Sequence, residues 1–299
     1  MKEDNVELTN LSFLHAQSNH RKIIGAVATK SQNQQFNGSL LHDFEVLIIV
    51  VCSYHEQVEI IEHRIDGSNT HVQVIYVDQD MLEHCMITGD NRMMIEHFLN
   101  GELLWDTDEQ IDKLRQQFMH FSSPLRERRI FLEFTHFLTL YVEAKHYMKQ
   151  NQVMDAYNSI FQALQHWARI DLSEKGIYPE SAVWEQVRTL KLDVYKLYEQ
   201  LAFSVETMEQ RVELVLLACE FSVMSKMREC SSILFQVLRS RKQPWSVKEL
   251  VQHPDLSHVG NMLPMVIRKL VYRSLINEVV SWRPEQAGGE REIRYWLNR

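Results

Sequence analysis

Two carboxylates, Asp43 and Glu45, stand directly before the longest apolar run of the chain, residues 46–52. Side chains of a β-strand alternate between its faces, so acids separated by one residue project from the same face. Paired carboxylates hold divalent cations, and two such cations can stabilise both oxygens of a phosphoryl displacement. Asp43 and Glu45 are therefore candidate metal ligands and candidate catalytic residues, with Mg²⁺ as the expected ion.

A Gly-Ser pair, Gly38 and Ser39, precedes these acids. Backbone N–H groups of such a turn, placed at a helix N-terminus, bind phosphate oxygens. Gly38 and Ser39 are thus candidates for holding the triphosphate of an NTP. Each residue also has a plainer interpretation, because Gly and Ser are common in ordinary turns and acids at a strand start are often solvated. The four residues alone do not separate these interpretations.

The segments around these residues predict a mixed sheet with helices. A helix is expected over residues 19–35, before Asn37-Gly38 breaks the pattern. Residues 46–52 are apolar and rich in β-branched side chains, which is typical of a central strand buried on both faces. Residues 57–65 and 71–78 predict a hairpin because turn residues separate them. A further helix is expected from about residue 79.

The character of the chain changes at Ser123-Pro124, after which apolar residues recur at helical spacing. Four long amphipathic helices, the last two over residues 181–203 and 208–239, predict a bundle. Two apolar stripes carry this prediction, namely Ile130, Phe134, Phe137, Tyr141 and Met148, then Val153, Tyr157, Ile160, Leu164 and Trp167. The polar face opposite the second stripe either lines a cleft facing the N-terminal domain or faces water; it includes Asp155, Gln162, His166 and Arg169.

The segment after Arg241 is more basic than the rest. Ten Lys and Arg residues against six Asp and Glu residues give it a net charge of +4, whereas the whole chain carries -8. A capping-box pattern at Ser246 and Glu249, a helix over residues 260–274 and two strand-like segments follow the order of a winged helix-turn-helix. Such a module binds DNA or serves as a capping or dimerising element. The basic residues on its longer helix and hairpin are Arg268, Lys269, Arg273, Arg291 and Arg294.

Composition narrows the class of protein. The 299 residues suffice for two or three domains, and 45% hydrophobic and 24% charged residues are ordinary for a soluble globular chain. No secretory signal is visible at the N-terminus, and residues 46–52 are too few to cross a bilayer, so we expect a cytoplasmic protein without membrane contacts. The cysteines lack metal-ligand spacing, which favours buried thiols at Cys52, Cys85, Cys219 and Cys230.

Gly-Ser followed by Asp-x-Glu and an apolar strand resembles the polymerase-β nucleotidyltransferase superfamily. Residues 71–84 resemble the segment that usually bears its third carboxylate, and residues 100–106, Asn-Gly-Glu-Leu-Leu-Trp-Asp, resemble the motif that closes its catalytic domain. Residues 155–187 resemble the nucleotidyltransferase-like (YgxA-like) family of Bacillus-type bacteria, a resemblance that covers nearly the whole chain. It implies transfer of a nucleoside monophosphate from an NTP, with Mg²⁺, to a hydroxyl acceptor, and a homodimer is plausible.

The resemblance implies an α+β chain of three domains. These are a nucleotidyltransferase-like domain with a mixed sheet over residues 1–122, an all-α, substrate-binding-like bundle over 123–241 and a winged helix-turn-helix-like domain over 242–299.

Two departures from the superfamily pattern concern the site. The connection between Ser39 and Asp43 is shorter than in active relatives, and neutral Gln73 stands where a third acid is expected. Asp78 and Asp80 are possible substitutes further along. Two hypotheses follow: an enzyme with a degenerate metal site, or a catalytically inactive module that senses a nucleotide or binds DNA or protein through its C-terminal domain.

Overall fold

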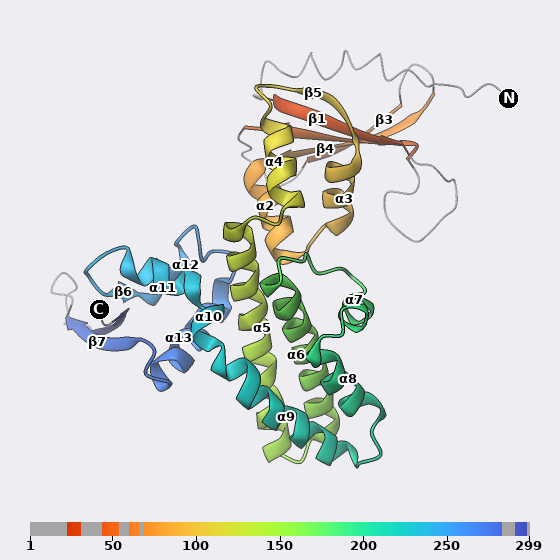
Figure 1. The fold of residues 1–299 in the computed structure, drawn as a ribbon. Helices are drawn as coiled ribbons and strands as arrows, with labels where there is room; N and C mark the ends of the chain where they lie inside the picture. The colour runs from red at the N-terminus through yellow and green to blue at the C-terminus, as the bar shows by residue number, and fades with distance from the viewer. Residues whose placement is uncertain (1–22, 31–43, 54–59, 66–68, 283–290, 298–299) are drawn as a thin grey trace. The chain divides into compact units, whose positions relative to one another are not determined.

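A computed structural model describes residues 23–30, 44–53, 60–65, 69–282 and 291–297. The chain divides into two compact units, Met1–Ser122 and Ser123–Arg299, which we call the sheet unit and the helical unit (Figure 1). Mixed α and β structure is therefore confirmed, with strands dominating the first unit and helices the second. No helix in the described part of the chain is long and apolar enough to cross a membrane.

The described residues of the sheet unit form five strands. Their order across the sheet is β3 (Ile60–Ile65), β4 (His71–Asp78), β2 (Val46–Cys52), β1 (Ile23–Lys30) and β5 (Glu102–Asp106). Only β2 and β4 run parallel among these neighbours; the other pairs are antiparallel. The predicted central strand is confirmed, because β2 lies in the middle and all of its residues are buried. The predicted hairpin is confirmed by the pairing of β3 with β4.

The helix expected over residues 19–35 is wrong, since residues 23–30 form strand β1. This strand lies between β2 and β5, and most of its side chains are buried. Burial on both faces removes the apolar-polar alternation that marks a half-exposed strand. Gly25 allows the close approach of β5, because a Cβ atom there would stand 2.6 Å from the carbonyl oxygen of Trp105.

Within the described part of the unit, three helices cover one side of the sheet (Figure 1). They are α2 (Gln79–Thr88), α3 (Arg92–Asn100) and α4 (Gln110–Met119), and they contact β4 and β1. Gly89, with φ 80°, ends α2 in the left-handed conformation that favours glycine. The opposite face of the sheet holds a buried cluster that includes Val72, Val74 and Tyr76, as their alternation with Gln73 predicts.

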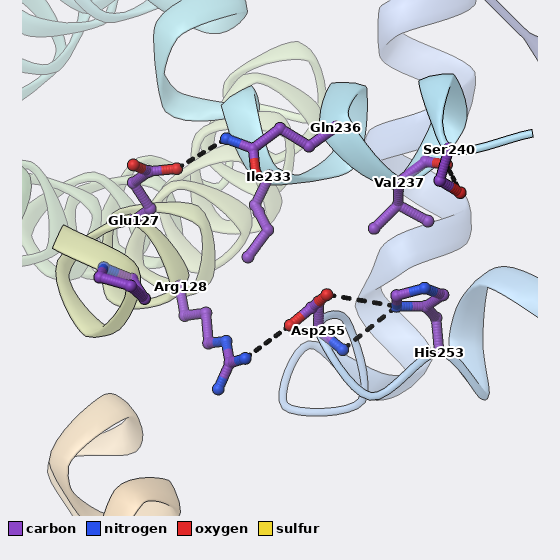
Figure 2. Close-up of a pocket in the computed structure, with 9 residues that line it drawn as sticks. Glu127, Arg128, Ile233, Gln236, Val237, Ser240, His253 and Asp255 are labelled. Atoms are coloured by element: carbon purple, nitrogen blue, oxygen red, sulfur yellow. Dashed lines mark hydrogen bonds and ion pairs between the residues drawn. The ribbon is translucent and has the colours of Figure 1, made fainter.

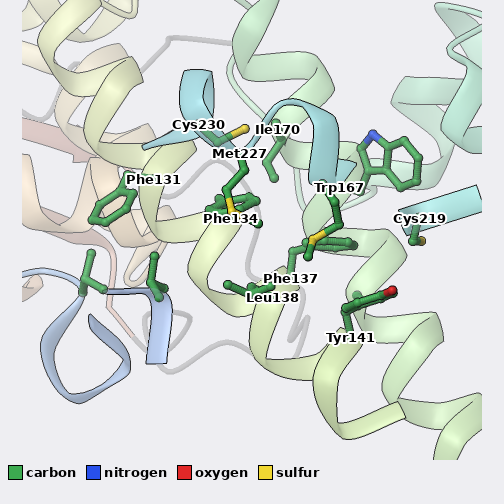
Figure 3. Packing of buried hydrophobic residues seen from close by; sticks show 14 of the residues in the cluster. Phe131, Phe134, Phe137, Leu138, Tyr141, Trp167, Ile170, Cys219, Met227 and Cys230 are labelled. Atoms are coloured by element: carbon green, nitrogen blue, oxygen red, sulfur yellow. The ribbon is translucent and has the colours of Figure 1, made fainter. Parts of the chain in front are cut away.

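The helical unit is organised around two antiparallel helices, α5 (Ser123–Lys149) and α6 (Val153–Glu174), which pack along their lengths. Phe134, Phe137 and Tyr141 of α5 meet Trp167 of α6 in the core, and Met227 and Cys219 extend it (Figure 3). All four cysteines are free and buried, which confirms the sequence prediction.

The last two predicted bundle helices are each interrupted. Residues 181–203 form α7 (Val183–Thr189) and α8 (Asp193–Phe203), and Lys191 between them has φ 52°. Residues 208–239 form α9 (Met208–Ser225), α10 (Met227–Cys230) and α11 (Ser232–Arg239). Helical periodicity continues across these breaks, which is why the sequence alone suggests single long helices.

The C-terminal segment packs into the same core as the bundle. It contains β6 (Trp245–Ser246), α12 (Val247–Val251), the 3₁₀ turn η1 (Gly260–Met262), α13 (Leu263–Tyr272), β7 (Asn277–Trp282) and β8 (Arg291–Trp296). The capping box at Ser246 and Glu249 is confirmed, and β8 lies between β6 and β7 in a three-stranded sheet. One buried cluster runs from Phe131 to Tyr295. The winged helix-turn-helix assignment and a separate third domain stay predictions.

Candidate nucleotide site and a buried charge cluster

Among the four candidate site residues, Glu45 is the one that lies within the described part of the chain. Gly38, Ser39 and Asp43 lie outside it. Glu45 stands at the start of β2, level with His71 at the start of the parallel neighbour β4, because Val46 pairs with Val72. The geometry of the candidate site therefore rests on these two strand starts.

Glu45 holds the start of β4 through both its backbone and its side chain. Its N–H donates to the carbonyl oxygen of His71 at 3.0 Å, and its Oε2 accepts from the N–H of His71 at 3.1 Å. One carboxylate oxygen is thus engaged by the backbone, while Oε1 accepts no hydrogen bond from the described residues. The side chain is exposed, so Oε1 is open to a cation.

Gln73 occupies the position of the expected third acid. It pairs with Leu47, two residues beyond Glu45, so Gln73 and Glu45 lie on the same face of the sheet. The residue is only 5% exposed, and its Nε2 lies 3.4 Å from Nε2 of His63 on β3. The ring of Phe44 lies against His63, with 4.5 Å between ring centroids. A neutral amide that contacts an imidazole thus stands at the position where a third acid is expected from the sequence.

Asp78 does not compensate for this loss. It lies seven residues after His71, which is about 23 Å along the strand at ~3.3 Å per residue. Its Oδ1 caps α2 by accepting the N–H of Met81 at 2.8 Å. Asp80 follows in the first turn of that helix, at the same remote end of β4. Neither residue can join Glu45 at the candidate site.

Asp106, the last residue of the Asn-Gly-Glu-Leu-Leu-Trp-Asp motif, anchors a helix. Its two carboxylate oxygens accept the N–H groups of Ile111 at 2.9 Å and Asp112 at 3.0 Å, in the first turn of α4. A carboxylate at a helix N-terminus is favoured by the helix dipole. Across the described residues, no group of three or more His, Cys, Asp or Glu side chains is arranged to hold a metal ion.

The helical unit contains a buried charge cluster centred on Glu133 of α5. This side chain is 4% exposed and lies 3.1 Å from Nη2 of Arg129, one turn earlier, and 2.6 Å from Nδ1 of His166 on α6. Arg169 adds a third contact at 3.8 Å. Burial alone would raise the pKa of Glu133, but the hydrogen bond with His166 and the charges of Arg129 and Arg169 hold that pKa below its usual range. Glu133 is therefore ionised at neutral pH.

The loop after α6 covers the cluster. The Tyr178 hydroxyl accepts a hydrogen bond from Nη1 of Arg129 at 3.3 Å, and the Arg129 guanidinium lies over the Tyr178 ring, 4.9 Å from its centroid. The imidazoles of His136 and His166 stack, with 4.8 Å between centroids. Of the polar face expected opposite the α6 core, His166 and Arg169 thus turn toward Glu133, whereas Asp155 and Gln162 are exposed.

Two family models match the chain. The nucleotidyltransferase-like model matches residues 9–128, and the YgxA-like substrate binding domain model matches residues 127–226. The protein YgxA of Bacillus subtilis (strain 168) is 33% identical over 261 residues, which covers 87% of each chain. The chain belongs to this nucleotidyltransferase-like family. Its fold is also similar to the crystal structure of a nucleotidyltransferase-like protein from Exiguobacterium sibiricum 255-15, with a TM-score of 0.83, 27% identity and coverage of 95% of this chain and 96% of that one.

The family's substrate-binding region includes Glu133 and His166, which sequence reasoning did not connect. In the sequence, Glu133 resembles any other charged residue of an amphipathic helix. Its partner His166 lies 33 residues away along the chain. The available signal was the spacing of Arg129 and Glu133, which places both charges on one helix face. This spacing is also common on solvated helices, so it does not by itself predict burial.

A pocket of about 320 Å³ opens elsewhere in the helical unit, among the start of α5, α11 and the segment after α12 (Figure 2). The polar side chains that line it bond one another. Arg128 pairs with Asp255 at 2.5 Å, and the N–H of Asp255 donates to Nδ1 of His253 at 3.2 Å. Gln236 donates to Glu127 at 2.9 Å. The pair of Arg128 and Asp255 ties the C-terminal segment to the bundle.

Several basic residues of the C-terminal segment are engaged within the chain. Arg268 of α13 pairs with Glu278, and Arg273 lies 3.6 Å from Glu220 on α9. Arg294 lies 3.0 Å from its neighbour Glu292, and it also pairs with Glu249. Charges neutralised in this way attract nucleic-acid phosphates less strongly than the net charge of the segment suggests.

Proposed function

We propose that this chain binds a nucleoside triphosphate with one divalent cation in the sheet unit and transfers a nucleoside monophosphate to a hydroxyl acceptor. Glu45 carries the proposal, because it stands at the start of a buried central strand, where the family's Asp-x-Glu pattern places a metal ligand, and its Oε1 accepts no hydrogen bond from the described residues. Asp43 would share the cation, and Gly38 and Ser39 would hold the phosphates. Membership of the nucleotidyltransferase-like family supports this assignment.

The candidate ligands suit one cation better than two. Mg²⁺ is commonly bound through one or two carboxylates together with phosphate oxygens of the substrate. Glu45 and the predicted ligand Asp43 would supply these carboxylates, whereas a second cation would need an acid at Gln73, whose amide lies against His63. When bound, the cation would neutralise charge that develops on the phosphates. The acceptor would bind in the region matched by the substrate-binding model.

Thermal shift measurements with ATP, CTP, GTP and UTP, each with and without Mg²⁺, test the proposal. We expect at least one nucleotide to raise the melting temperature in a Mg²⁺-dependent manner. The variant Glu45→Gln should abolish this shift while keeping an acceptor for the N–H of His71, and Asp43→Ala should act similarly. Asp80→Ala, an acid at the remote end of β4, is the matched control. No shift with any nucleotide would refute the proposal.

A second candidate is a catalytically inactive nucleotide sensor or interaction module. The observation that favours it is the contact between the buried amide of Gln73 and the imidazole of His63 at the expected third-acid position. In this case a nucleotide would bind but release no pyrophosphate. Binding of duplex DNA that weakens steeply with salt and requires Arg268 and Arg273 would assign the interaction to the C-terminal segment. Absence of salt-dependent DNA binding would exclude that version.

A further inference from the structure

Helix α9 of the helical unit carries apolar side chains on two faces (Figure 1). Its inner face packs into the shared core through Val212, Val215, Leu216 and Cys219. Its outer face presents Leu214, Leu217 and Phe221, which are 47%, 56% and 74% exposed. A helix that is apolar all round is normally buried all round. The outer face of α9 is therefore typical of a helix that packs against a second surface.

The three outer residues form one row, which we call the α9 stripe. They follow one another at spacings of three and four residues, so their side chains are neighbours along one face of the helix. Single exposed apolar residues are normal on a protein surface, whereas contiguous ones mark interaction sites. Tyr272 of α13 is also exposed, and its neighbour Arg273 lies 3.6 Å from Glu220 of α9. Exposed apolar surface thus extends from the stripe toward α13.

Beside the C-terminal half of the stripe, three cations share one acid. Glu220 precedes Phe221 and contacts Nζ of Lys145 at 2.9 Å and Nη2 of Arg273 at 3.6 Å. Lys269 lies one turn before Arg273, and burial together with repulsion from Arg273 and Lys145 lowers its pKa. Three positive charges against one negative charge leave an excess of +2. We call these four residues the basic group.

Beside the N-terminal half of the stripe, acids dominate. Glu206, Glu209 and Glu213 are exposed there, and Arg211 is the one cation among residues 206–217, which gives this half a charge of -2. Nη1 of Arg211 donates to two backbone carbonyl oxygens at the end of α8. Glu213 precedes Glu220 by seven residues, or about two helical turns, so both lie on the same flank of the stripe.

We propose that α9 packs antiparallel against α9 of a second copy of this chain, across a twofold axis at Leu217. In this arrangement Leu214 of each copy faces Phe221 of the other, and the two Leu217 side chains meet at the axis. Side chains on the same flank meet when two helices pair antiparallel. Glu213 of each copy therefore faces the basic group of the other.

Charge selects both the occupant and the direction. The acidic half and the basic group lie on one chain, so a second copy supplies the complement of each, as a twofold interface requires. A parallel pair would place the two acidic halves side by side, and like charges across an interface are unfavourable. The stripe is small beside a stable interface of about 20–30 residues per partner. The dimer therefore dissociates on dilution.

Sedimentation equilibrium of the full chain, from about 1 to 100 μM, tests the association without any nucleotide or cation. We expect a monomer–dimer equilibrium. Leu217→Glu brings two like charges together at the axis, so it should raise the dissociation constant at least about 30-fold. Leu190→Glu, at a leucine of similar exposure outside α9, is the matched control and should keep the wild-type constant. Neither change should alter the melting temperature of the dilute monomer.

Reversing charges one at a time tests the direction of the helices. Glu213→Arg and Arg273→Glu should each raise the dissociation constant by about 3–10-fold, because each removes the attraction between Glu213 and the basic group. When the two variants are mixed, every reversed charge meets an opposite one in the mixed dimer. The mixture should therefore associate more tightly than either variant does with itself, which a fluorescent label on one variant detects.

Three results would overturn the proposal. The first is a wild-type chain that stays monomeric: a lower melting temperature in Leu217→Glu would then assign the stripe to another part of the same chain, and an unchanged one to a different protein. The second is a dimer that Leu217→Glu leaves intact, because its interface lies elsewhere. The third is a dimer lost in Leu217→Glu whose charge variants do not associate more tightly when mixed, which excludes the antiparallel arrangement.

Discussion

The two candidate regions use a glutamate in opposite ways. Glu45 of the sheet unit is exposed and accepts one backbone N–H, whereas Glu133 of the helical unit is buried among Arg129, His166 and Arg169. An exposed carboxylate keeps its hydration until a cation arrives, so it can bind one without disturbing the fold. A buried carboxylate needs permanent partners because desolvation of a charge is costly. The comparison teaches that Glu45 could take a ligand without losing a buried partner, whereas Glu133 joins α5 to α6 through permanent contacts.

The largest effect is expected from removing the buried carboxylate. Glu133→Ala should destabilise the protein by about 3–5 kcal/mol, because it leaves the Arg129 charge buried without its acid partner. Urea unfolding followed by circular dichroism measures the change. A decrease of the free energy of unfolding below about 1 kcal/mol would show that water reaches the charges around Glu133. Glu133 would then not differ from the exposed Glu45 in its need for permanent partners.

A moderate effect is expected when an acid is placed beside Glu45. Gln73→Glu introduces a carboxylate at a position that is 5% exposed, which should cost about 1–3 kcal/mol in the absence of metal. Added Mg²⁺ should recover part of this stability by binding the new carboxylate together with Glu45. Calorimetric titration with Mg²⁺ should then show tighter binding than in wild type. Identical Mg²⁺ affinity would place Gln73 outside the metal site.

Acidification should destabilise the protein through Glu133 of the helical unit. The pKa of Glu133 is lowered in the folded state, so its contribution to stability is present above the unfolded pKa, near 4.5, and is lost as pH falls through the folded value. The melting temperature of wild type should therefore fall on acidification below about pH 4.5 more steeply than that of Glu133→Gln. Parallel curves for the two proteins would contradict this linkage.

The smallest effect is expected at the sheet site. Glu45→Gln should change the free energy of unfolding by less than about 0.5 kcal/mol, because the side chain is exposed and the amide oxygen can still accept from the N–H of His71. The same urea titration measures it. A loss as large as that of Glu133→Ala would mean that the carboxylate of Glu45 is structural, and it would weaken its assignment as a metal ligand.

The sequence predicts best those strands whose hydrophobic pattern can be recognised within a few residues. The apolar run of β2 and the alternation of Val72, Val74 and Tyr76 identify two strands. The register between β2 and β4, which only the structure supplies, places Gln73 on the face that Glu45 shares. Strand β1 is mistaken for a helix because the side chains on both of its faces are buried, so that no period of two is visible. Pairing partners distant in sequence supply this information, and a local window does not contain it.

The two candidate regions also differ in whether a short stretch of sequence contains their residues. Asp43 and Glu45 can be recognised because one short motif contains them, although only Glu45 lies within the described residues. The pair of Glu133 and His166 joins two helices, and nothing local marks either residue as buried. Likewise, the remoteness of Asp78 becomes evident only from the register of β4, which places that residue at the far end of the strand.

The shared core of the helical unit has a consequence for synthesis of the chain. All five strands of the sheet unit come from residues up to Asp106, so this sheet can close while translation continues. The core of the helical unit extends from Phe131 to Tyr295, and β8 pairs on both sides. Part of this core therefore stays uncovered on the ribosome until Tyr295 has emerged, and exposed apolar surface of this kind favours aggregation.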